Sequence, residues 1–162
     1  MVRFDVSSLI KASLGTSLPL PVNTGPQALT DLEVNYLRGT LQAIRIQHGI
    51  LVQGQLETEI DQACVRCLAP FKLTATLEIE ETFRLPGSPP DEEILYAVDE
   101  DGLLDLTPLV REKCWLAIPI KALCTEDCQG LCPQCGTNLN VEQCSCDTSQ
   151  IDPRLAALKE LL

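Results

Sequence analysis

Cys124-Thr-Glu-Asp-Cys128-Gln-Gly-Leu-Cys132-Pro-Gln-Cys135-Gly-Thr-Asn-Leu-Asn-Val-Glu-Gln-Cys144-Ser-Cys146 holds six of the nine cysteines of the chain within 23 residues. A hydrophobic core has no use for so many small thiols beside Gly, Asn, Gln and Glu, so they are expected to bind something. At its centre, Cys132-Pro-Gln-Cys135-Gly136 is a turn in which Pro presets one dihedral angle and Gly lets backbone amides face the sulfurs. This pattern is typical of a zinc knuckle.

Two other uses of the thiols compete with zinc. A disulfide framework needs an oxidising compartment, but Asp5 and Lys11 interrupt the first residues where an export signal would be apolar. The thiols are therefore expected to stay reduced. A redox dithiol needs one C-x2-C pair and does not explain six clustered cysteines. Zinc is the preferred interpretation.

The cysteines can be divided among metal sites in two ways. In the preferred division, one zinc site takes Cys132, Cys135, Cys144 and Cys146, and the other takes Cys64, Cys67, Cys124 and Cys128. In the alternative, a single zinc ion takes Cys124, Cys128, Cys132 and Cys135, which leaves Cys64 and Cys67 as a turn pair. Four thiolate ligands leave no open coordination position, so the sites are expected to be structural.

No catalytic constellation appears in the sequence. His48 is the only histidine and falls in a predicted hairpin turn, so no Ser/His or Cys/His pair is indicated. The sequence contains no glycine-rich phosphate-binding loop. We therefore expect that the protein is not an enzyme.

The charge of the chain disfavours direct binding to nucleic acid. The formal net charge is −11, and each four-thiolate zinc site would add −2. The basic residues that could share a sheet face for contact with RNA or a partner are Arg38, Arg45, Arg66, Lys72 and Arg84. The alternative is ordinary surface pairing with Glu57, Glu59, Glu78 and Glu80. No apolar run approaches the about 20 residues of a membrane span.

The hydrophobic pattern predicts an antiparallel sheet. Residues 1–31 form a short strand or helix followed by an extended linker through Leu18-Pro-Leu-Pro21. A strand begins at Leu32, with a bulge or kink near Gly39, and alternation predicts further strands over 50–60 and 73–79. These three strands are expected to form a meander.

The rest of the chain predicts helices around an acidic segment. Residues 86–105 are acidic, with a short edge strand near Ile94–Val98. The ordinary interpretation is a solvated loop, and the alternative is a segment that mimics RNA or docks a basic ribosomal protein. Thr107-Pro108 predicts an N-cap and the start of a helix that covers the sheet, with Cys114 as a core thiol. Asp152-Pro153 predicts a short terminal helix. The expected fold is α+β, with an N-terminal segment (1–31), a sheet body with its covering helix (32–122), and a zinc knuckle with the terminal helix (123–162).

Three motifs resemble the YceD family of large ribosomal RNA subunit accumulation proteins. They are Cys64-Val-Arg-Cys67-Leu-Ala-Pro-Phe71, the segment from Leu123 to Asn140 that contains Cys132-Pro-Gln-Cys135-Gly136, and Asp152-Pro-Arg-Leu-Ala-Ala-Leu-Lys-Glu-Leu161. The resemblance covers most of the chain from about residue 30.

The resemblance implies a role in 23S ribosomal RNA processing or stability during large-subunit assembly, in bacteria and chloroplasts. It also implies a link to a small ribosomal protein of that subunit. An acidic zinc protein fits this role best as an adaptor for a basic ribosomal protein, with a precursor of the large ribosomal RNA as the other candidate partner. A thiol-based metal or redox sensor is the alternative function.

Overall fold

The computed structural model describes residues 1–89 and 94–146, and it divides into two compact units. Unit 1 combines Met1–Gln62 with Phe71–Ile120, and unit 2 combines Ala63–Pro70 with the chain from Lys121 onward. The loop with Cys64 and Cys67 therefore belongs with the cysteine-rich segment, whereas the sequence places it within the sheet body. No described helix is long and apolar enough to cross a membrane.

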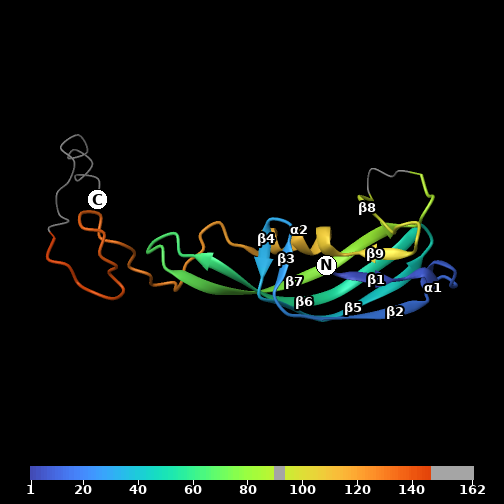
Figure 1. Ribbon diagram of the computed structural model, residues 1–162, viewed down its shortest axis with the longest axis horizontal. Coiled ribbons are helices and arrows are strands. Elements are labelled where there is room, and N and C mark those ends of the chain that lie inside the picture. Colours follow the sequence, from blue (N-terminus) through green and yellow to red (C-terminus); the bar gives the residue numbers. More distant parts are fainter. Residues whose placement is uncertain (90–93, 147–162) are drawn as a thin grey trace, which may run out of the picture. The chain divides into compact units, whose positions relative to one another are not determined.

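A five-stranded sheet forms the larger part of unit 1 (Figure 1). Its strands, in spatial order, are β2 (Ser17–Thr24), β5 (Tyr36–Ile46), β6 (Gly49–Ala63), β7 (Pro70–Arg84) and β8 (Tyr96–Ala97). β2 pairs antiparallel with β5, β5 pairs antiparallel with β6, and β8 pairs parallel with β7. The two strands predicted over 50–60 and 73–79 lie within β6 and β7, and His48 lies in the turn between β5 and β6.

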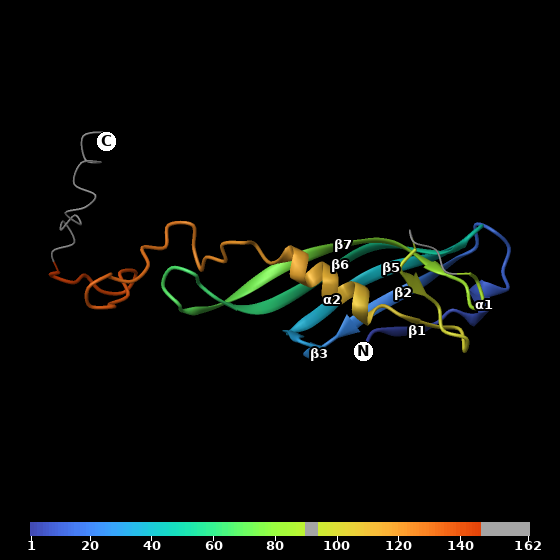
Figure 2. The same ribbon diagram turned by 90° about the horizontal axis from the view of Figure 1, so that it is seen from above.

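Short elements cover one face of this sheet (Figures 1 and 2). They are β1 (Arg3–Asp5) paired with β9 (Leu103–Asp105), β3 (Gln27–Leu29) paired with β4 (Leu32–Val34), and the helices α1 (Ser7–Ile10) and α2 (Thr107–Ala117). Arg111 of α2 forms an ion pair with Asp31 in the β3–β4 turn. The covering layer is thus joined by a charged contact as well as by packing.

The core lies between the covering layer and the sheet. Every second residue of β6 points inward, and the side chains of Ile50, Val52, Leu56 and Ile60 are at most 1% exposed. Leu109, Val110 and Cys114 of α2 belong to the same apolar cluster. Burial raises the pKa of the Cys114 thiol to about 11, and the prediction of a core thiol is confirmed.

The predicted linker contains a strand. Ser17–Thr24 form β2 at one edge of the sheet, with Leu20 and Val22 buried and Pro19 and Pro21 exposed. Proline cannot donate to a strand ladder, but an edge strand has one side on which no donor is needed. The two prolines therefore make this segment resemble a linker in the sequence, although its buried apolar residues alternate with exposed residues as in a strand.

The prediction of a bulge or kink at Gly39 is wrong. β5 continues through Gly39, which pairs with both Val22 and Leu56, and the break in the chain falls at Asn35 instead. Gly39 has φ 153°, and a Cβ atom there would lie 2.3 Å from the backbone oxygen of Gln55. The glycine thus permits close approach of two strands.

The predicted N-cap at Thr107 is also corrected. Thr107 is the first residue of α2, the cap position is Leu106, and the Thr107 hydroxyl accepts a hydrogen bond from the Val2 N–H at 3.0 Å. The Asp105 carboxylate accepts from the Thr107 N–H at 2.9 Å, so it satisfies one free donor of the first turn. Pro108 follows at the start of the helix as predicted.

The predicted edge strand near Ile94–Val98 is confirmed as β8, which pairs with β7 at the end of the sheet order. The acidic residues Asp91, Glu92 and Glu93 and the predicted terminal helix from Asp152 lie outside the described residues.

Tyr96 is expected to lose its proton unusually late in an alkaline titration. Burial and the hydrogen bond from its hydroxyl to Glu112, at 2.7 Å, raise its pKa to about 12. The chain has two tyrosines, so an ultraviolet absorbance titration resolves them. Tyr96→Phe should remove the later transition, and Glu112→Gln should bring it back toward the ordinary value of about 10. A later transition that persists in Tyr96→Phe would contradict this assignment.

Candidate metal centres

Two groups of four cysteines come together in unit 2. We call Cys64, Cys67, Cys124 and Cys128 the first tetrad, and Cys132, Cys135, Cys144 and Cys146 the second tetrad. In each tetrad, all four sulfur atoms lie within 4.8 Å of one another. These are the two ligand sets of the preferred division. The four ligands of the single-ion alternative are split, with Cys124 and Cys128 in the first tetrad and Cys132 and Cys135 in the second.

Two similar turns position a cysteine pair of each tetrad. After Cys67, Leu68 has φ 60° and donates its N–H to the Cys64 carbonyl at 2.9 Å. After Cys135, Gly136 has φ 75° and donates to the Cys132 carbonyl, also at 2.9 Å. A left-handed residue directly after the pair turns the chain so that both sulfurs face the same point. Leucine fills this position in the first turn and glycine in the second.

The first tetrad has sulfur spacings that fit a tetrahedral metal. The sulfurs of Cys64 and Cys128 are 3.7 Å apart, and those of Cys67 and Cys124 are 3.6 Å apart. A zinc–sulfur bond of about 2.3 Å gives tetrahedral edges of about 3.8 Å, whereas a disulfide bond is about 2.05 Å. The described geometry therefore fits four free thiolates around one ion and does not fit disulfide bonds.

Proton binding within the first tetrad is uneven. The backbone N–H of Cys67 lowers the pKa of Cys64 to about 6. The Ala69 N–H lowers the pKa of Cys67, but burial and the neighbouring sulfurs outweigh it and raise that pKa to about 12. Ionisation of one thiol therefore disfavours ionisation of its neighbour. A bound divalent cation would be needed for all four sulfurs to carry charge.

The second tetrad is more accessible. Cys132 is buried, Cys144 and Cys146 are partly exposed, and Cys135 is exposed. Hydrogen bonds with the side chain and backbone of Thr137 lower the pKa of Cys135 to about 6. The neighbouring side chain of Cys135, together with burial, raises the pKa of Cys146 to about 12. The same uneven pattern thus recurs at a site that solvent reaches more easily.

Arg66 and Asn140 support the first tetrad from outside. Arg66 donates a guanidinium N–H to the Cys128 carbonyl at 2.9 Å. Asn140 donates its side-chain amide to the Cys128 sulfur at 3.4 Å, and its side-chain oxygen accepts from the Gln129 N–H at 2.8 Å. Asn140 lies between Cys135 and Cys144 in the sequence, so the loop of the second tetrad touches a ligand of the first. The sequence does not single out Asn140, because one asparagine in a polar loop gives no distinctive signal.

Asn140→Ala is expected to weaken metal binding at the first tetrad about 10- to 100-fold, the usual effect of removing a hydrogen bond to a ligand. Zinc affinity is measured by competition with a coloured chelator. The matched control is Gln143→Ala, an exposed amide in the same loop. Equal zinc affinities for the two variants would contradict a supporting role for Asn140.

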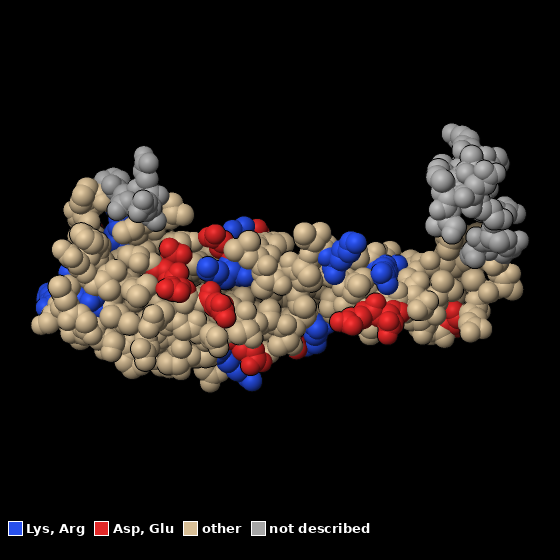
Figure 3. Space-filling model, turned by 180° about the vertical axis from the view of Figure 1, so that it is seen from behind, with Lys and Arg blue, Asp and Glu red and all other residues tan. Residues whose placement is uncertain are grey.

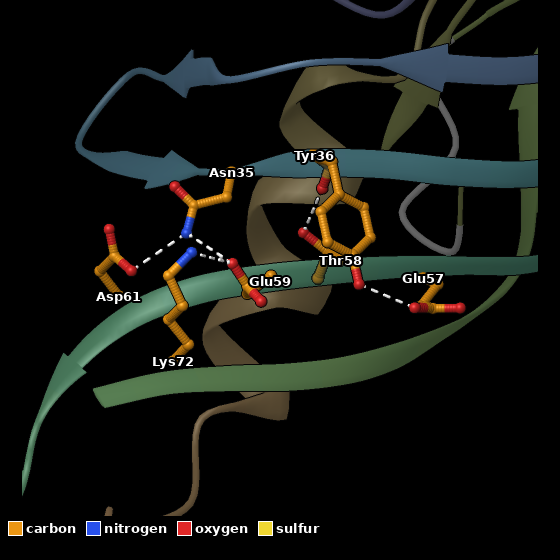
Figure 4. A network of polar contacts seen from close by, with 7 residues as sticks. All are labelled: Asn35, Tyr36, Glu57, Thr58, Glu59, Asp61 and Lys72. Carbon is orange, nitrogen blue, oxygen red and sulfur yellow. Dashed lines mark hydrogen bonds and ion pairs between the residues drawn. The ribbon is translucent and has the colours of Figure 1, made fainter.

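The predicted basic contact residues have local partners. Lys72 pairs with Glu59 at 2.6 Å, as the alternative interpretation expects, within the polar network of Figure 4. Arg38 lies 4.8 Å from the centre of the Tyr36 ring, Arg45 donates to the Ile46 and Gly49 carbonyls, and Arg84 donates to Ser88 and Pro89. The face seen in Figure 3 carries both basic and acidic described side chains, and some of the acidic ones lie next to one another. Contact of these residues with RNA or a partner stays a prediction.

Comparison with known proteins gives one family and several relatives. The family model "Large ribosomal RNA subunit accumulation protein YceD" matches residues 52–162. An uncharacterized protein of Mycobacterium tuberculosis is 35% identical over 140 residues, which cover 83% of this chain and 63% of the relative. The protein YlbN of Bacillus subtilis is 28% identical over 126 residues, which cover 77% of this chain and 71% of that protein.

A plant protein is similar over a shorter stretch. The "Large ribosomal RNA subunit accumulation protein YCED homolog 1, chloroplastic" of Arabidopsis thaliana is 33% identical over 70 residues, 43% of this chain and 22% of that protein. The chain thus spans less than two thirds of the mycobacterial relative and under a quarter of the plant one. No solved structure matches the chain.

Proposed function

The chain belongs to the YceD family, and from this premise we propose that it is a ribosome biogenesis factor needed for the accumulation or processing of 23S ribosomal RNA during assembly of the large subunit. The family match over residues 52–162 carries the proposal, because it includes both cysteine tetrads. The proposed location is the bacterial cytoplasm, or the chloroplast stroma for a plastid form.

The proposed mode of action is that of a zinc-stabilised adaptor. Each tetrad offers four sulfur ligands, so a zinc ion in it would have no open position for substrate and would serve folding. His48, the only histidine, lies in a strand turn. These features favour a role without catalysis.

The net charge of −11 favours a basic protein as the direct partner over RNA. The negative charge would attract a basic protein of the large subunit, whereas it would repel the phosphates of RNA. Binding of the purified protein to such a ribosomal protein should weaken as salt is raised. Tight binding to naked 23S RNA with a steep salt dependence would contradict the adaptor.

Depletion of the protein from cells tests the proposed function as a whole. Sucrose-gradient profiles should show fewer large subunits, and the ratio of large to small ribosomal RNA from the same lysate should fall. Re-expression of the protein should restore both. An unchanged profile and ratio would contradict the role in large-subunit assembly.

A thiol-based sensor is the second candidate function, and the exposure of Cys135 favours it. A sensor should lose zinc from the second tetrad under mild peroxide and recover it on reduction. The same treatment should change ribosomal RNA accumulation in cells. If oxidation released zinc without any such consequence, the metal would serve folding alone.

A further inference from the structure

Among the described residues, one edge of the five-stranded sheet has no neighbouring strand over most of its length. In the described part of the chain, β7 has β6 on one side, and on the other it pairs with β8 at Phe83 and Arg84 alone. The Arg84 carbonyl accepts from the Val98 N–H at 2.9 Å, so the backbone groups of Arg84 point to the open side. The direction of backbone groups alternates along a strand, so the even-numbered residues before Arg84 face the same way.

We call this stretch the free edge. It presents the backbone groups of Lys72, Thr74, Thr76, Glu78 and Glu80. The side chains of all five residues are exposed. The stretch is about 26 Å long at the usual rise per residue, which is enough to pair with an added strand.

The opposite edge of the same sheet is closed to such pairing. β2 carries Pro19 and Pro21 with exposed side chains, and these residues supply no N–H donors on the side away from β5. Prolines and charges are the usual protection of an edge against unwanted strands. The free edge of β7 has no proline between Phe71 and Arg84, so its donors are intact.

Charge selects the strand that can occupy the free edge. Glu78 and Glu80 are exposed there, whereas Lys72 is held by Glu59 at 2.6 Å. A second copy of this chain would bring its own glutamates to the same surface, in addition to a net charge of −11 on each copy. An extended segment rich in Lys and Arg would place opposite charges beside these carboxylates.

We propose that the free edge of β7 binds an extended, Lys/Arg-rich segment of a partner protein as an additional strand. Main-chain hydrogen bonds to the even-numbered residues from Lys72 to Glu80 would hold the segment, and Glu78 and Glu80 would select its charge. The proposal rests on the proposed adaptor function and specifies the surface used.

The test measures binding of a blocked peptide of alternating Arg and Val, about nine residues long, to the full chain by fluorescence anisotropy. Amide hydrogen exchange with and without the peptide should show new protection at Thr74, Thr76, Glu78 and Glu80, but not at the odd-numbered residues between them. The same peptide with N-methylated backbone amides should bind at least tenfold more weakly. Equal binding of the two peptides would overturn the proposal.

Matched variants separate the backbone contribution from charge. Thr76→Pro removes one donor of the free edge and should weaken binding about tenfold, whereas Thr76→Ala keeps that donor and should bind as the parent does. Glu78→Gln with Glu80→Gln should weaken binding and reduce its salt dependence. Glu100→Gln with Asp101→Asn removes the same charge from an exposed turn and should have a smaller effect.

Two further outcomes would overturn the proposal. One is protection outside β7 on peptide binding, and the other is protection of the free edge by concentration alone, which would indicate pairing between copies of the chain. The peptide experiment is independent of the depletion experiment. A selective loss of large subunits without peptide binding would refute the free-edge proposal and leave the proposed function standing.

Discussion

Cys64→Ser is expected to abolish zinc binding at the first tetrad and to unfold unit 2, while unit 1 stays folded. Structural zinc contributes about 10–16 kcal/mol to the folding of small zinc modules, and the described residues of unit 2 offer few other means of stabilisation. The buried residues among them are mainly the cysteines themselves, whereas the apolar cluster of unit 1 includes none of the tetrad residues. Metal analysis after purification should show the loss of at least one zinc ion per chain, since the second tetrad lies in the same unit, and amide NMR should show collapse of the unit 2 signals alone.

Cys114→Ala is the matched control. Cys114 is a cysteine in the core of unit 1, so its truncation should lower the stability of the sheet by about 1–2 kcal/mol and leave the zinc content unchanged. Cys64→Ser should therefore affect unit 2, and Cys114→Ala should affect unit 1. An unchanged zinc content in Cys64→Ser would refute the metal assignment of the first tetrad.

Gly39→Ala is expected to destabilise unit 1 by about 3–5 kcal/mol, because two costs act at the same position. The backbone has φ 153°, and the new Cβ atom would lie 2.3 Å from the Gln55 backbone oxygen. That oxygen belongs to the neighbouring strand and cannot move without breaking the β5–β6 ladder. The melting temperature followed by circular dichroism should fall by about 10 °C or more.

Gly25→Ala provides the comparison, since a Cβ atom there meets nothing within 4 Å. Its stability should stay within about 0.5 kcal/mol of the parent. Zinc content should be the same in both variants, because the tetrads lie in the other unit. Similar melting temperatures for Gly39→Ala and Gly25→Ala would show that the strands can separate at Gly39 without cost.

The sequence predicts the cysteine groups well because ligand chemistry restricts the choices. Close pairs such as Cys64 and Cys67 must act together, and removal of the apolar Cys114 leaves a multiple of four. The long strands β6 and β7 are also predictable, since their alternation extends over many residues. The alternation of the strands is a local signal, and the grouping of the cysteines follows from their number and spacing.

The missed features depend on neighbours that are distant in sequence. Pro19 and Pro21 indicate a linker until β5 is known to lie on one side of them only. Gly39 indicates a kink until the Gln55 oxygen is placed beside it. Asn140 gains a role only because Cys128 folds within reach of its amide. In each case a tertiary contact determines what an ambiguous residue does.

The first tetrad joins cysteines that the ribosome adds at very different times. Cys67 precedes Cys124 by 57 residues, and Cys64 precedes Cys128 by 64 residues. At about 5–20 residues per second, the early pair waits about 3–13 s for its partners during translation. All four sulfurs of this tetrad are therefore available to a metal ion only when most of the chain has been made, so metal binding there would be a late step in the synthesis of the protein.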